Sequence, residues 1–221
     1  MRNLQNKDGL VSWRSINKFH SELQEELFVI DYFGHKQNGF VLDIGAADGI
    51  TGSNSFRLIN EYNWSGFLIE ACPKHESNLK ILYDDIKDVN YFLGAVNQTK
   101  KEIMFYEVAE HDMGLSNTIG ELYTRNQDFI NYQVQCLDIN SILEKYNIPL
   151  DIDFVSLDIE GSENQVLDNW NFDKYKVKLW CVEENNENYE SLFNFYGYQK
   201  LIIPSDFQVC NYNSFYGKQM C

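Results

Sequence analysis

Basic residues are scarce in this sequence. There are 18 Lys and Arg against 33 Asp and Glu, which gives a formal net charge of −15 at pH 7. Sequence-independent binding to nucleic acid needs a basic stripe that neutralises phosphates, and docking on anionic lipid also needs a cationic face. The composition therefore argues against a nucleic-acid partner and against a membrane partner. An acidic surface by itself indicates solubility.

Long apolar runs and paired cysteines are also lacking. The opening residues, MRNLQNKDGLVSW, contain no apolar run of the length of a signal peptide, and no later segment is long enough for a transmembrane helix. No CxxC pair occurs among the five widely spaced cysteines, Cys72, Cys136, Cys181, Cys210 and Cys221. This pattern supports neither a zinc ribbon nor a disulfide framework. We therefore expect a reduced, cytoplasmic protein.

What is present is an alternation of short apolar segments with segments of helical spacing. The 221 residues, 44% of them hydrophobic, suffice for one core, and we expect a single domain over residues 1–221 with an N-terminal helical region at 1–35. The alternation is typical of an α/β protein with a mainly parallel sheet. Predicted strands are FVLDI, GFLIE, VNYFLGAV, IDFVSLD, VKLWCVEE, YQKLIIP and FQVCNY. Predicted helices are SELQEELFVIDYF with Ser21 as its cap, SNSFRLINEY, PKHESNLKILY, DINSILEKY with Asp138 as its cap, SENQVLDNW and YESLFNFY.

One segment interrupts the alternation. After a hairpin-like strand, KEIMFYEV, residues 107–135 are mostly polar and show little periodicity. Loops of this length inside compact domains are usually functional or disordered. We expect an insertion here that covers the substrate. It contains His111 beside Asp112, and His111 is a candidate base on such a loop. The remaining histidines, His20, His35 and His75, have no partner pattern and are expected at the surface.

Acidic residues end three of the predicted strands, at Asp43 or Asp48, at Glu70 and at Asp158. In parallel sheets, ligands bind at the carboxyl ends of the strands, near the point where the strand order reverses. Glu70 stands where a carboxylate can accept hydrogen bonds from both hydroxyls of a ribose, a position that also suits NAD. The sequence thus favours a nucleoside ligand, with a solvated strand end as the plainer interpretation of Glu70.

The glycine loop narrows the kind of nucleoside. Its sequence, Gly45-Ala46-Ala47-Asp48-Gly49, departs from the dinucleotide fingerprint G-x-G-x-x-G. Ala47 stands at the second glycine, and Asp48 places a negative charge where a phosphate would lie. A ligand without phosphate and with a positive centre fits better, and S-adenosylmethionine carries both an ammonium and a sulfonium. The alternative is an ordinary strand-to-helix turn.

The ordered set of motifs resembles the FkbM-type methyltransferases, within the broad class of Rossmann-like S-adenosylmethionine enzymes. The resemblance covers roughly residues 19–186 and is carried by SELQEELFVIDYF, NGFVLDIGAADGITGSNS, WSGFLIEACP, LGAV, VQCLDINSIL and IDFVSLDIEGSENQVL. The family's usual threonine after Ser-Asn is Ser55 here, which keeps the hydroxyl. The resemblance implies a class I methyltransferase fold, with a mainly parallel seven-stranded sheet and helices on both faces.

The resemblance also implies site residues and a substrate class. A cofactor loop would be shaped by Asp43, Gly45, Ala46, Asp48 and Gly49, with Asn54 nearby, Glu70 on the ribose and Ala95 beside the adenine. The implied reaction is O-methylation of a sugar, a nucleotide-sugar or another small hydroxyl compound. An NAD-dependent oxidoreductase and a non-catalytic nucleoside-binding module remain as alternatives.

The catalytic candidates lie late in the chain. LDIEGSE supplies Asp158, Glu160 and Glu163, and CVEENN adds Glu183, Glu184 and Asn185. In an extended chain, Asp158 and Glu160 would share a side. These acids could hold Mg²⁺, as in catechol-type methyltransferases, could bind the cofactor's ammonium and cap the next helix, or could accept a proton directly. We favour a reaction without an essential metal, with Asp158, Glu160 and His111 as catalytic candidates and Asp158 also as a cofactor ligand.

Overall fold

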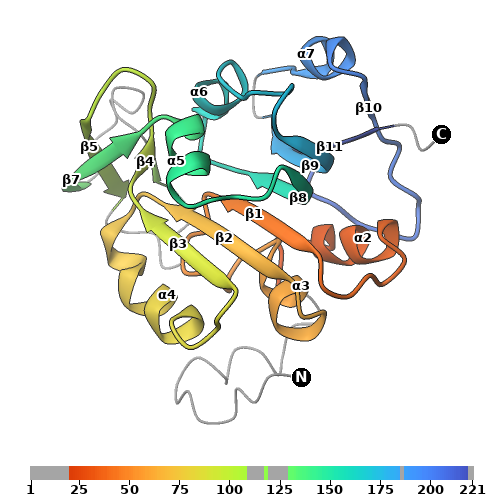
Figure 1. Ribbon diagram of the computed structural model, residues 1–221, viewed down its shortest axis with the longest axis horizontal. Helices are drawn as coiled ribbons and strands as arrows, with labels where there is room; N and C mark the ends of the chain where they lie inside the picture. The colour runs from red at the N-terminus through yellow and green to blue at the C-terminus, as the bar shows by residue number, and fades with distance from the viewer. Residues whose placement is uncertain (1–19, 109–116, 119–128, 185–186, 219–221) are drawn as a thin grey trace.

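A seven-stranded sheet forms the centre of the protein (Figure 1). The structure is a computed structural model, and it describes residues 20–108, 117–118, 129–184 and 187–218. The strand order is β10-β11-β9-β8-β1-β2-β3, and only β11 runs antiparallel to its neighbours. The strands are β1 (Phe40–Ile44), β2 (Ser65–Glu70), β3 (Val89–Leu93), β8 (Asp151–Leu157), β9 (Lys176–Glu183), β10 (Tyr198–Lys200) and β11 (Asn213–Lys218). The predicted α/β class and the mainly parallel sheet are confirmed.

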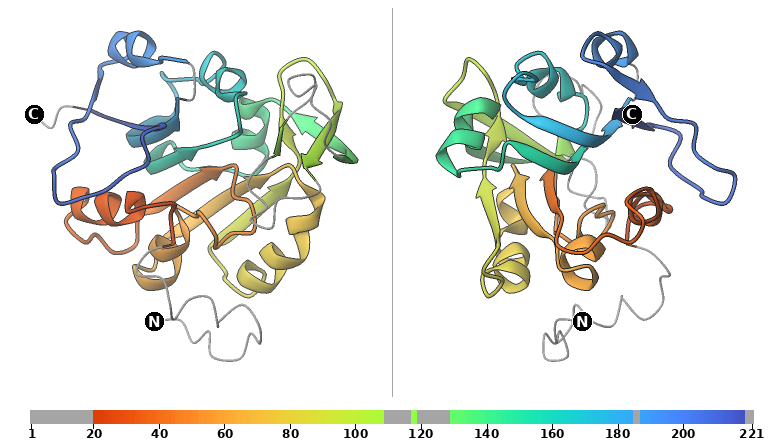
Figure 2. Two further views of the ribbon diagram at one scale, coloured as in Figure 1. Left: turned by 180° about the vertical axis from the view of Figure 1, so that it is seen from behind. Right: turned by 45° about the vertical axis from the view of Figure 1, so that its right-hand side comes forward.

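Helices cover both faces of this sheet (Figure 2). On one face, α2 (Glu25–Tyr32), α3 (Phe56–Glu61) and α4 (Glu76–Tyr83) pack on side chains such as Val41 and Leu68. On the other face, α5 (Ile139–Lys145), α6 (Glu163–Leu167) and α7 (Glu190–Phe195) pack on a cluster that contains Leu42 and Ile44. Successive residues of β1 therefore serve opposite cores, as the period of two in a strand requires. The central strands are buried on both sides.

A smaller sheet lies beside the large one, in the order β4-β7-β5-β6. It consists of β4 (Ala95–Val96), β5 (Glu102–Val108), β6 (Asn117–Thr118) and β7 (Phe129–Leu137). The single strand expected over VNYFLGAV is wrong, because the chain leaves the large sheet at Gly94. A side-chain Cβ there would lie 2.5 Å from the Phe92 ring and 2.7 Å from the Gln135 carbonyl oxygen. The turn at Gly94 carries Ala95 into the small sheet.

The segment expected to be an insertion, residues 107–135, is partly a strand. Residues 129–135 belong to β7, which pairs with β5 along its length. Alternation in FINYQVQCL is the signal that the sequence analysis missed. His111 lies outside the described residues, so its predicted role as a base stays a prediction.

Two other expectations about elements are wrong. Ser21 does not cap α2, which begins at Glu25 after Gln24; Ser21 instead forms an isolated parallel bridge with Gly52. The last strand is Asn213–Lys218 rather than FQVCNY, because residues before it are bonded to the start of α2. There, the Gln24 N–H donates to the Gln208 carbonyl (2.8 Å). Asp138 caps α5 as predicted, accepting from the Ser141 N–H at 3.0 Å.

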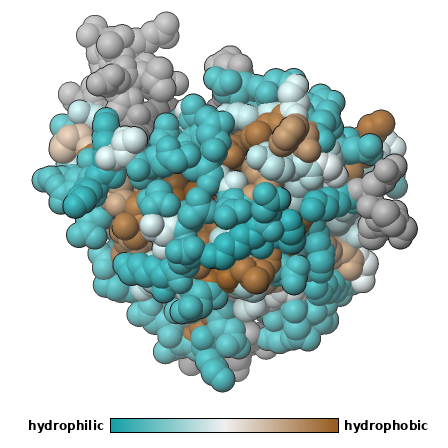
Figure 3. Space-filling model, turned by 45° about the horizontal axis from the view of Figure 1, so that its top comes forward, coloured by the Kyte–Doolittle hydropathy of each residue, from teal (hydrophilic) through white to brown (hydrophobic). Residues whose placement is uncertain are grey.

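The surface agrees with the acidic, polar composition. The face in Figure 3 is largely hydrophilic, and hydrophobic side chains appear there in separate patches. Within the described part of the chain, no helix has the length and apolar character needed to cross a membrane. His75 was expected at the surface but is only 5% exposed, since it lies between β2 and α4 in the short 3-10 turn Pro73–His75.

Candidate active site

A pocket opens at the carboxyl ends of β1, β2 and β8, with β4 along one side. This is the edge at which parallel sheets bind ligands. Its wall includes eight of the residues proposed from the sequence: Asp43, Gly45, Ala46, Asn54, Glu70, Ala95, Asp158 and Glu160. The topology therefore brings together residues that lie more than a hundred positions apart in the chain. Asp48 and Gly49 are not in the wall.

Glu70 is the last residue of β2 and is fixed by the backbone around it. One carboxylate oxygen accepts from the Ala47 N–H at 2.7 Å, and the other accepts from the Cys72 N–H at 2.6 Å. Glu70 thus ties the end of β2 to the glycine loop after β1. Burial raises the pKa of this carboxyl to about 7. Each oxygen retains a second lone pair, so Glu70 can still accept hydrogen bonds from a ligand in the pocket.

Asp43 is held at the floor of the pocket by the Ser-Asn-Ser motif. The Ser55 hydroxyl donates to Asp43 at 2.5 Å, and burial raises the Asp43 pKa to about 6. The Ser53 hydroxyl accepts from the Phe56 N–H at 3.0 Å and so holds the start of α3. The serine at position 55 therefore performs its contact through the hydroxyl alone.

Asn54, the centre of that motif, has one free amide oxygen. Its Nδ2 donates to the Ser156 hydroxyl at 3.1 Å, which links the Ser-Asn-Ser motif to β8. Its Oδ1 is buried and has no hydrogen-bond partner among the described residues. A buried acceptor without a donor is costly. In a residue that lines the pocket, this oxygen fits a ligand that brings a hydrogen-bond donor.

Asp48 and Gly49 have contacts within the loop itself. The Asp48 carboxylate accepts from the Ile50 and Thr51 N–H groups at 2.8 and 2.7 Å and from the Thr51 hydroxyl at 2.9 Å. The Gly49 carbonyl accepts from the Tyr83 hydroxyl at 2.8 Å, which fastens the loop to α4. The Asp48 carboxylate is thus bonded within the turn, which weakens the expectation that it repels a phosphate. Ala47, at the position of the second glycine, is the stronger indication against a dinucleotide.

Gly45 allows the ends of β1 and β8 to meet. Its φ is +98°, and a Cβ on it would lie 1.6 Å from the carbonyl oxygen of Asp158. Only glycine fits such an approach in this conformation. The Asp158 N–H donates to the Ile44 carbonyl at 2.9 Å. Asp158 is therefore placed by direct backbone contact with the glycine loop.

A second group of carboxylates follows β8. Glu160 has a φ of +57°, so the chain is not extended there. The extended conformation that was expected to put Asp158 and Glu160 on one side is therefore not the one the chain adopts. The turn still places both in the pocket wall. It is closed by Glu163, which accepts from the Ile159 and Gly161 N–H groups at 3.0 and 3.2 Å. Glu163 is thus the residue that shapes the turn.

Burial and mutual repulsion raise the pKa values of these acids. The pKa of Asp158 is raised well above its usual value, first by burial and then by the charges of Glu183 and Glu160. Burial and the charges of Glu183 and Glu163 raise the pKa of Glu160 to about 8. Carboxyls with pKa values near neutrality are suited to proton transfer at physiological pH. The arrangement can therefore hold or accept a proton beside a ligand.

Of the acids that CVEENN supplies, Glu183 at the end of β9 belongs to this group, because its charge acts on Asp158 and Glu160, whereas Glu184 does not. Glu184 accepts from the Ser214 and Tyr216 hydroxyls, both at 2.5 Å, and thereby fastens β11. Asn185 lies outside the described residues. Over the described ranges, no cluster of three or more His, Cys, Asp or Glu side chains is placed to hold a metal ion.

Several pocket residues were not predicted from the sequence, among them Phe105, Ser156 and Glu22. Phe105 comes from β5 of the small sheet, Ser156 from the carboxyl end of β8, and Glu22 from the segment before α2. Ser156 lies inside a predicted strand, and its inward direction could have been derived from the alternation around Asp158. No local pattern marks Glu22, because a long-range bridge between Ser21 and Gly52 brings its segment to the pocket.

Comparisons with known proteins identify the family of this chain. A family model described as the methyltransferase FkbM domain matches residues 43–209. No curated protein sequence matches the chain. Among solved structures, a point mutant of MtNAS in complex with S-adenosylmethionine superposes with a TM-score of 0.50 at 9% identity, covering 97% of this chain and 68% of that one.

Two further solved structures match this chain at lower TM-scores. Precorrin-6y C5,15-methyltransferase from Geobacter metallireducens has a TM-score of 0.47 at 14% identity, with 91% of this chain and 93% of that chain covered. The METTL16 MTase domain has a TM-score of 0.48 at 10% identity over 87% of this chain, and the present chain spans 65% of its length. The family match covers most of the sequence, and the chain belongs to the FkbM methyltransferase domain family, with the Rossmann-like α/β fold of S-adenosylmethionine-dependent methyltransferases.

Proposed function

We propose that this protein transfers a methyl group to a hydroxyl of a sugar, a nucleotide-sugar or another small compound. The observation that carries the proposal is the position of Asp158, at the end of β8 and in contact with the glycine loop, together with its raised pKa. A hydroxyl attacks poorly while it keeps its proton, so O-methylation needs a group that accepts that proton. Asp158 is such a group.

The hydrogen-bonding groups of the pocket fit S-adenosylmethionine, the cofactor of the family. Bound S-adenosylmethionine supplies a methyl carbon activated by a sulfonium. Glu70 would accept hydrogen bonds from the ribose, Ala95 would lie beside the adenine, and Asn54 offers a buried oxygen that needs a donor. Asp43, Gly45 and Ala46 would form the floor around them. Binding of a cationic ligand favours the ionised forms of nearby carboxyls.

The chain's own task in this reaction is positioning and proton transfer. Gly45 and the Asp158 N–H hold the end of β8 against β1. Positioning the reacting groups at a fixed distance lowers a large part of the activation free energy of the reaction. Asp158 accepts the hydroxyl proton, and Glu160 lies in the same wall as a second acceptor. The pKa of Asp158 is raised, so its deprotonated form is favoured at higher pH and turnover should rise with pH.

Transfer of a labelled methyl group tests the proposal. Asp158→Asn should lower kcat by roughly 10²–10⁴-fold, the usual range for loss of a general base, and titration with S-adenosylhomocysteine separates this loss from any loss of cofactor binding. Asp168→Asn is the matched control, because Asp168 is exposed and outside the pocket wall. Acceptors would be sugars, aminosugars and nucleotide-sugars.

The outcomes distinguish the routes left open by the sequence. If EDTA abolishes turnover and Mg²⁺ restores it, the metal-dependent route replaces direct proton transfer. If His111→Ala loses turnover and Asp158→Asn does not, the base is His111. Normal turnover of Asp158→Asn contradicts the assignment of Asp158. Thermal stabilisation by NAD in place of S-adenosylhomocysteine would favour the oxidoreductase alternative.

A further inference from the structure

The pocket has a wall that the cofactor motifs do not supply. Residues 20–24, here termed the entry segment, run from the bridge between Ser21 and Gly52 to the start of α2. Gly52 itself lies in the pocket wall, and so does Glu22 of the entry segment. This segment therefore adds a carboxylate to the pocket from a part of the chain outside the cofactor loop.

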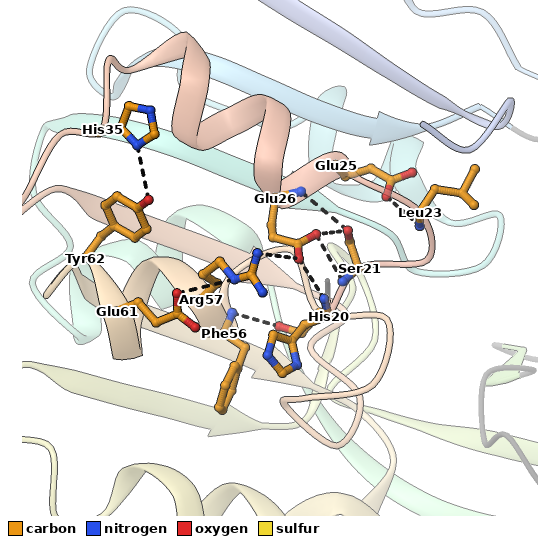
Figure 4. Close-up of polar contacts among 11 residues, drawn as sticks. His20, Ser21, Leu23, Glu25, Glu26, His35, Phe56, Arg57, Glu61 and Tyr62 are labelled. Atoms are coloured by element: carbon orange, nitrogen blue, oxygen red, sulfur yellow. Dashed lines mark hydrogen bonds and ion pairs between the residues drawn. The ribbon is translucent and has the colours of Figure 1, made fainter. Parts of the chain in front are cut away.

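Glu26 holds one side of the entry segment, as Figure 4 shows. Its carboxylate accepts from the His20 N–H at 2.6 Å, from the Ser21 N–H at 3.2 Å and from the Ser21 hydroxyl. Glu26 is fully buried, and Arg57 Nη1 lies 3.8 Å from it. A buried carboxylate with these donors fixes the backbone of His20 and Ser21, directly before Glu22.

Glu25 and Gln24 hold the other side. One Glu25 oxygen accepts from the Leu23 N–H at 2.9 Å, and the other accepts from the Cys210 N–H at 2.5 Å. Gln24 and Gln208 exchange two hydrogen bonds, at 2.8 Å through the Gln24 N–H and at 2.9 Å through the Gln208 N–H. Since the backbone is bonded before and after Glu22, the position of Glu22 at the pocket is set by the fold.

Glu22 and Glu160 mark the mouth of the pocket. Glu22 is exposed and Glu160 is half-buried, whereas Asp43 and Glu70 are 3% and 5% exposed and belong to the floor. Both residues line the same pocket, and the charge of Glu22 adds to the influences that raise the pKa of Glu160. Among the described residues of the pocket wall there is no Lys, Arg or His to balance them.

A second observation favours a ligand with hydrogen-bond donors in this pocket. The Asn54 side-chain oxygen is buried in the same pocket without a hydrogen-bond partner among the described residues, and Asn54 is only 7% exposed. Carboxylates that repel each other and an unsatisfied acceptor all gain from hydrogen-bond donors and positive charge. A phosphate would add repulsion at this mouth.

We propose that Glu22 and Glu160 form an acceptor-binding pair that takes a protonated amine, so that the methyl acceptor is an amine-bearing hydroxyl compound of the aminosugar kind. This inference rests on the proposed function, and it narrows the substrate class within it. A protonated amine between the two carboxylates relieves their repulsion and makes charge-assisted hydrogen bonds. Glu26 acts as a positioning residue, because it touches the entry segment and not the pocket.

Binding of three matched sugars to the protein tests the pair. The probes are glucosamine, N-acetylglucosamine and glucosamine 6-phosphate, titrated at pH 7 into protein saturated with S-adenosylhomocysteine. Glucosamine should bind about 10-fold or more tightly than N-acetylglucosamine, as expected for charge-assisted hydrogen bonds, and the phosphate form should bind less tightly than glucosamine. Glu22→Gln and Glu160→Gln should each remove most of this preference.

The control is Glu61→Gln. Glu61 is exposed and pairs with Arg57 at 3.5 Å, outside the pocket wall, so this variant has the same change of charge and should keep the preference. Equal binding of the three probes, or no binding of glucosamine, overturns the inference. So does a Glu22→Gln variant that weakens S-adenosylhomocysteine as much as glucosamine, since the pair would then bind the cofactor.

Failure of the proposed function is distinguishable from failure of the pair. If the wild type binds no S-adenosylhomocysteine, the proposed function fails. The same titrations are then read on the ligand-free protein. There, a preference for glucosamine that depends on Glu22 still supports the pair, and its absence overturns it.

Discussion

Gly45 and Asp158 show at the residue scale how this site is built. The two residues meet through backbone atoms, because a Cβ on Gly45 would lie 1.6 Å from the Asp158 carbonyl oxygen. The glycine therefore does more than allow a turn after β1. It permits the end of β8 to approach the cofactor loop, and the catalytic candidate Asp158 takes its place from that approach.

Replacement of Gly45 should therefore damage both stability and binding. Gly45→Ala adds a clash with backbone to a strained φ, and we expect a loss of about 3 kcal/mol in the free energy of unfolding and loss of S-adenosylhomocysteine binding. Gly161→Ala is the control: its φ is +93°, but nothing lies within 4 Å of its Cβ, so the cost should be about 1–2 kcal/mol. Chemical denaturation measures both. Equal losses in the two variants would contradict the close approach.

Residues at strand ends were predictable from the sequence, and residues brought in by long-range contacts were not. Asp43, Glu70 and Asp158 each follow an apolar run, and parallel strands place such ends at one edge. Glu22 follows no such run. It reaches the pocket because Ser21 bridges Gly52 and because Glu26 binds the backbone before it. The motif SELQEEL predicts a single helix, and nothing in its spacing indicates that its first four residues lie outside the helix.

At the scale of elements, the entry segment and the small sheet complete a site that the large sheet begins. The large sheet supplies the floor through β1, β2 and β8, whereas Phe105 of β5 and Ala95 of β4 belong to the small sheet. The hydrogen bond from Tyr132 to Glu107 at 3.0 Å, together with the Lys74–Glu107 ion pair, fastens the β5–β7 hairpin to the turn after β2. A buried carboxylate thus holds each of these two parts in place: Glu26 holds the entry segment and Glu107 holds the small sheet.

The role of Glu26 in the entry segment gives an element-scale prediction. Glu26→Gln replaces one of the two carboxylate oxygens by an amide NH2 group, which cannot accept from the backbone N–H that the lost oxygen bound, that of His20 or that of Ser21. An unsatisfied buried group costs about 1–3 kcal/mol, so the melting temperature should fall. Glucosamine affinity should fall with it, while S-adenosylhomocysteine affinity stays close to the wild-type value.

Ser21→Ala is the milder comparison, because it removes the hydroxyl bond and leaves both N–H bonds to Glu26. Calorimetric titration with the two ligands separates the effects. A Glu26→Gln protein that melts lower but binds glucosamine normally would show that Glu26 stabilises the fold without positioning Glu22.

The whole molecule carries an excess of negative charge, and several of its acidic residues line the pocket. Asp43, Glu70 and Glu160 have folded-state pKa values of about 6, 7 and 8, all above their usual range. The folded state therefore binds more protons than the unfolded state, and its stabilisation by these groups is complete below about pH 4 and is lost as the pH rises through the folded pKa values.

The ligand-free protein should therefore lose stability between pH 5.5 and pH 8.5. The lowered pKa values of Asp138, Asp153 and Glu184 have the opposite sign, but they act at lower pH, where those carboxyls become protonated. Glu160→Gln should flatten the fall in melting temperature, and Glu61→Gln, with the same change of net charge, should not. A melting temperature that rises across this window would contradict the assigned pKa shifts.

We propose that the pocket at the ends of β1, β2 and β8 is the S-adenosylmethionine site, with Glu70 on the ribose. Calorimetric titration of S-adenosylhomocysteine at pH 7, in two buffers of different ionisation enthalpy, tests it most directly. We predict binding with net release of protons, because hydrogen bonds donated by the ribose favour ionised Glu70. Glu70→Ala should weaken binding by about 1.5–3 kcal/mol, the range for hydrogen bonds to a charged group, and should reduce the proton release. No binding by the wild type, or equal affinity in Glu70→Ala, would contradict the account.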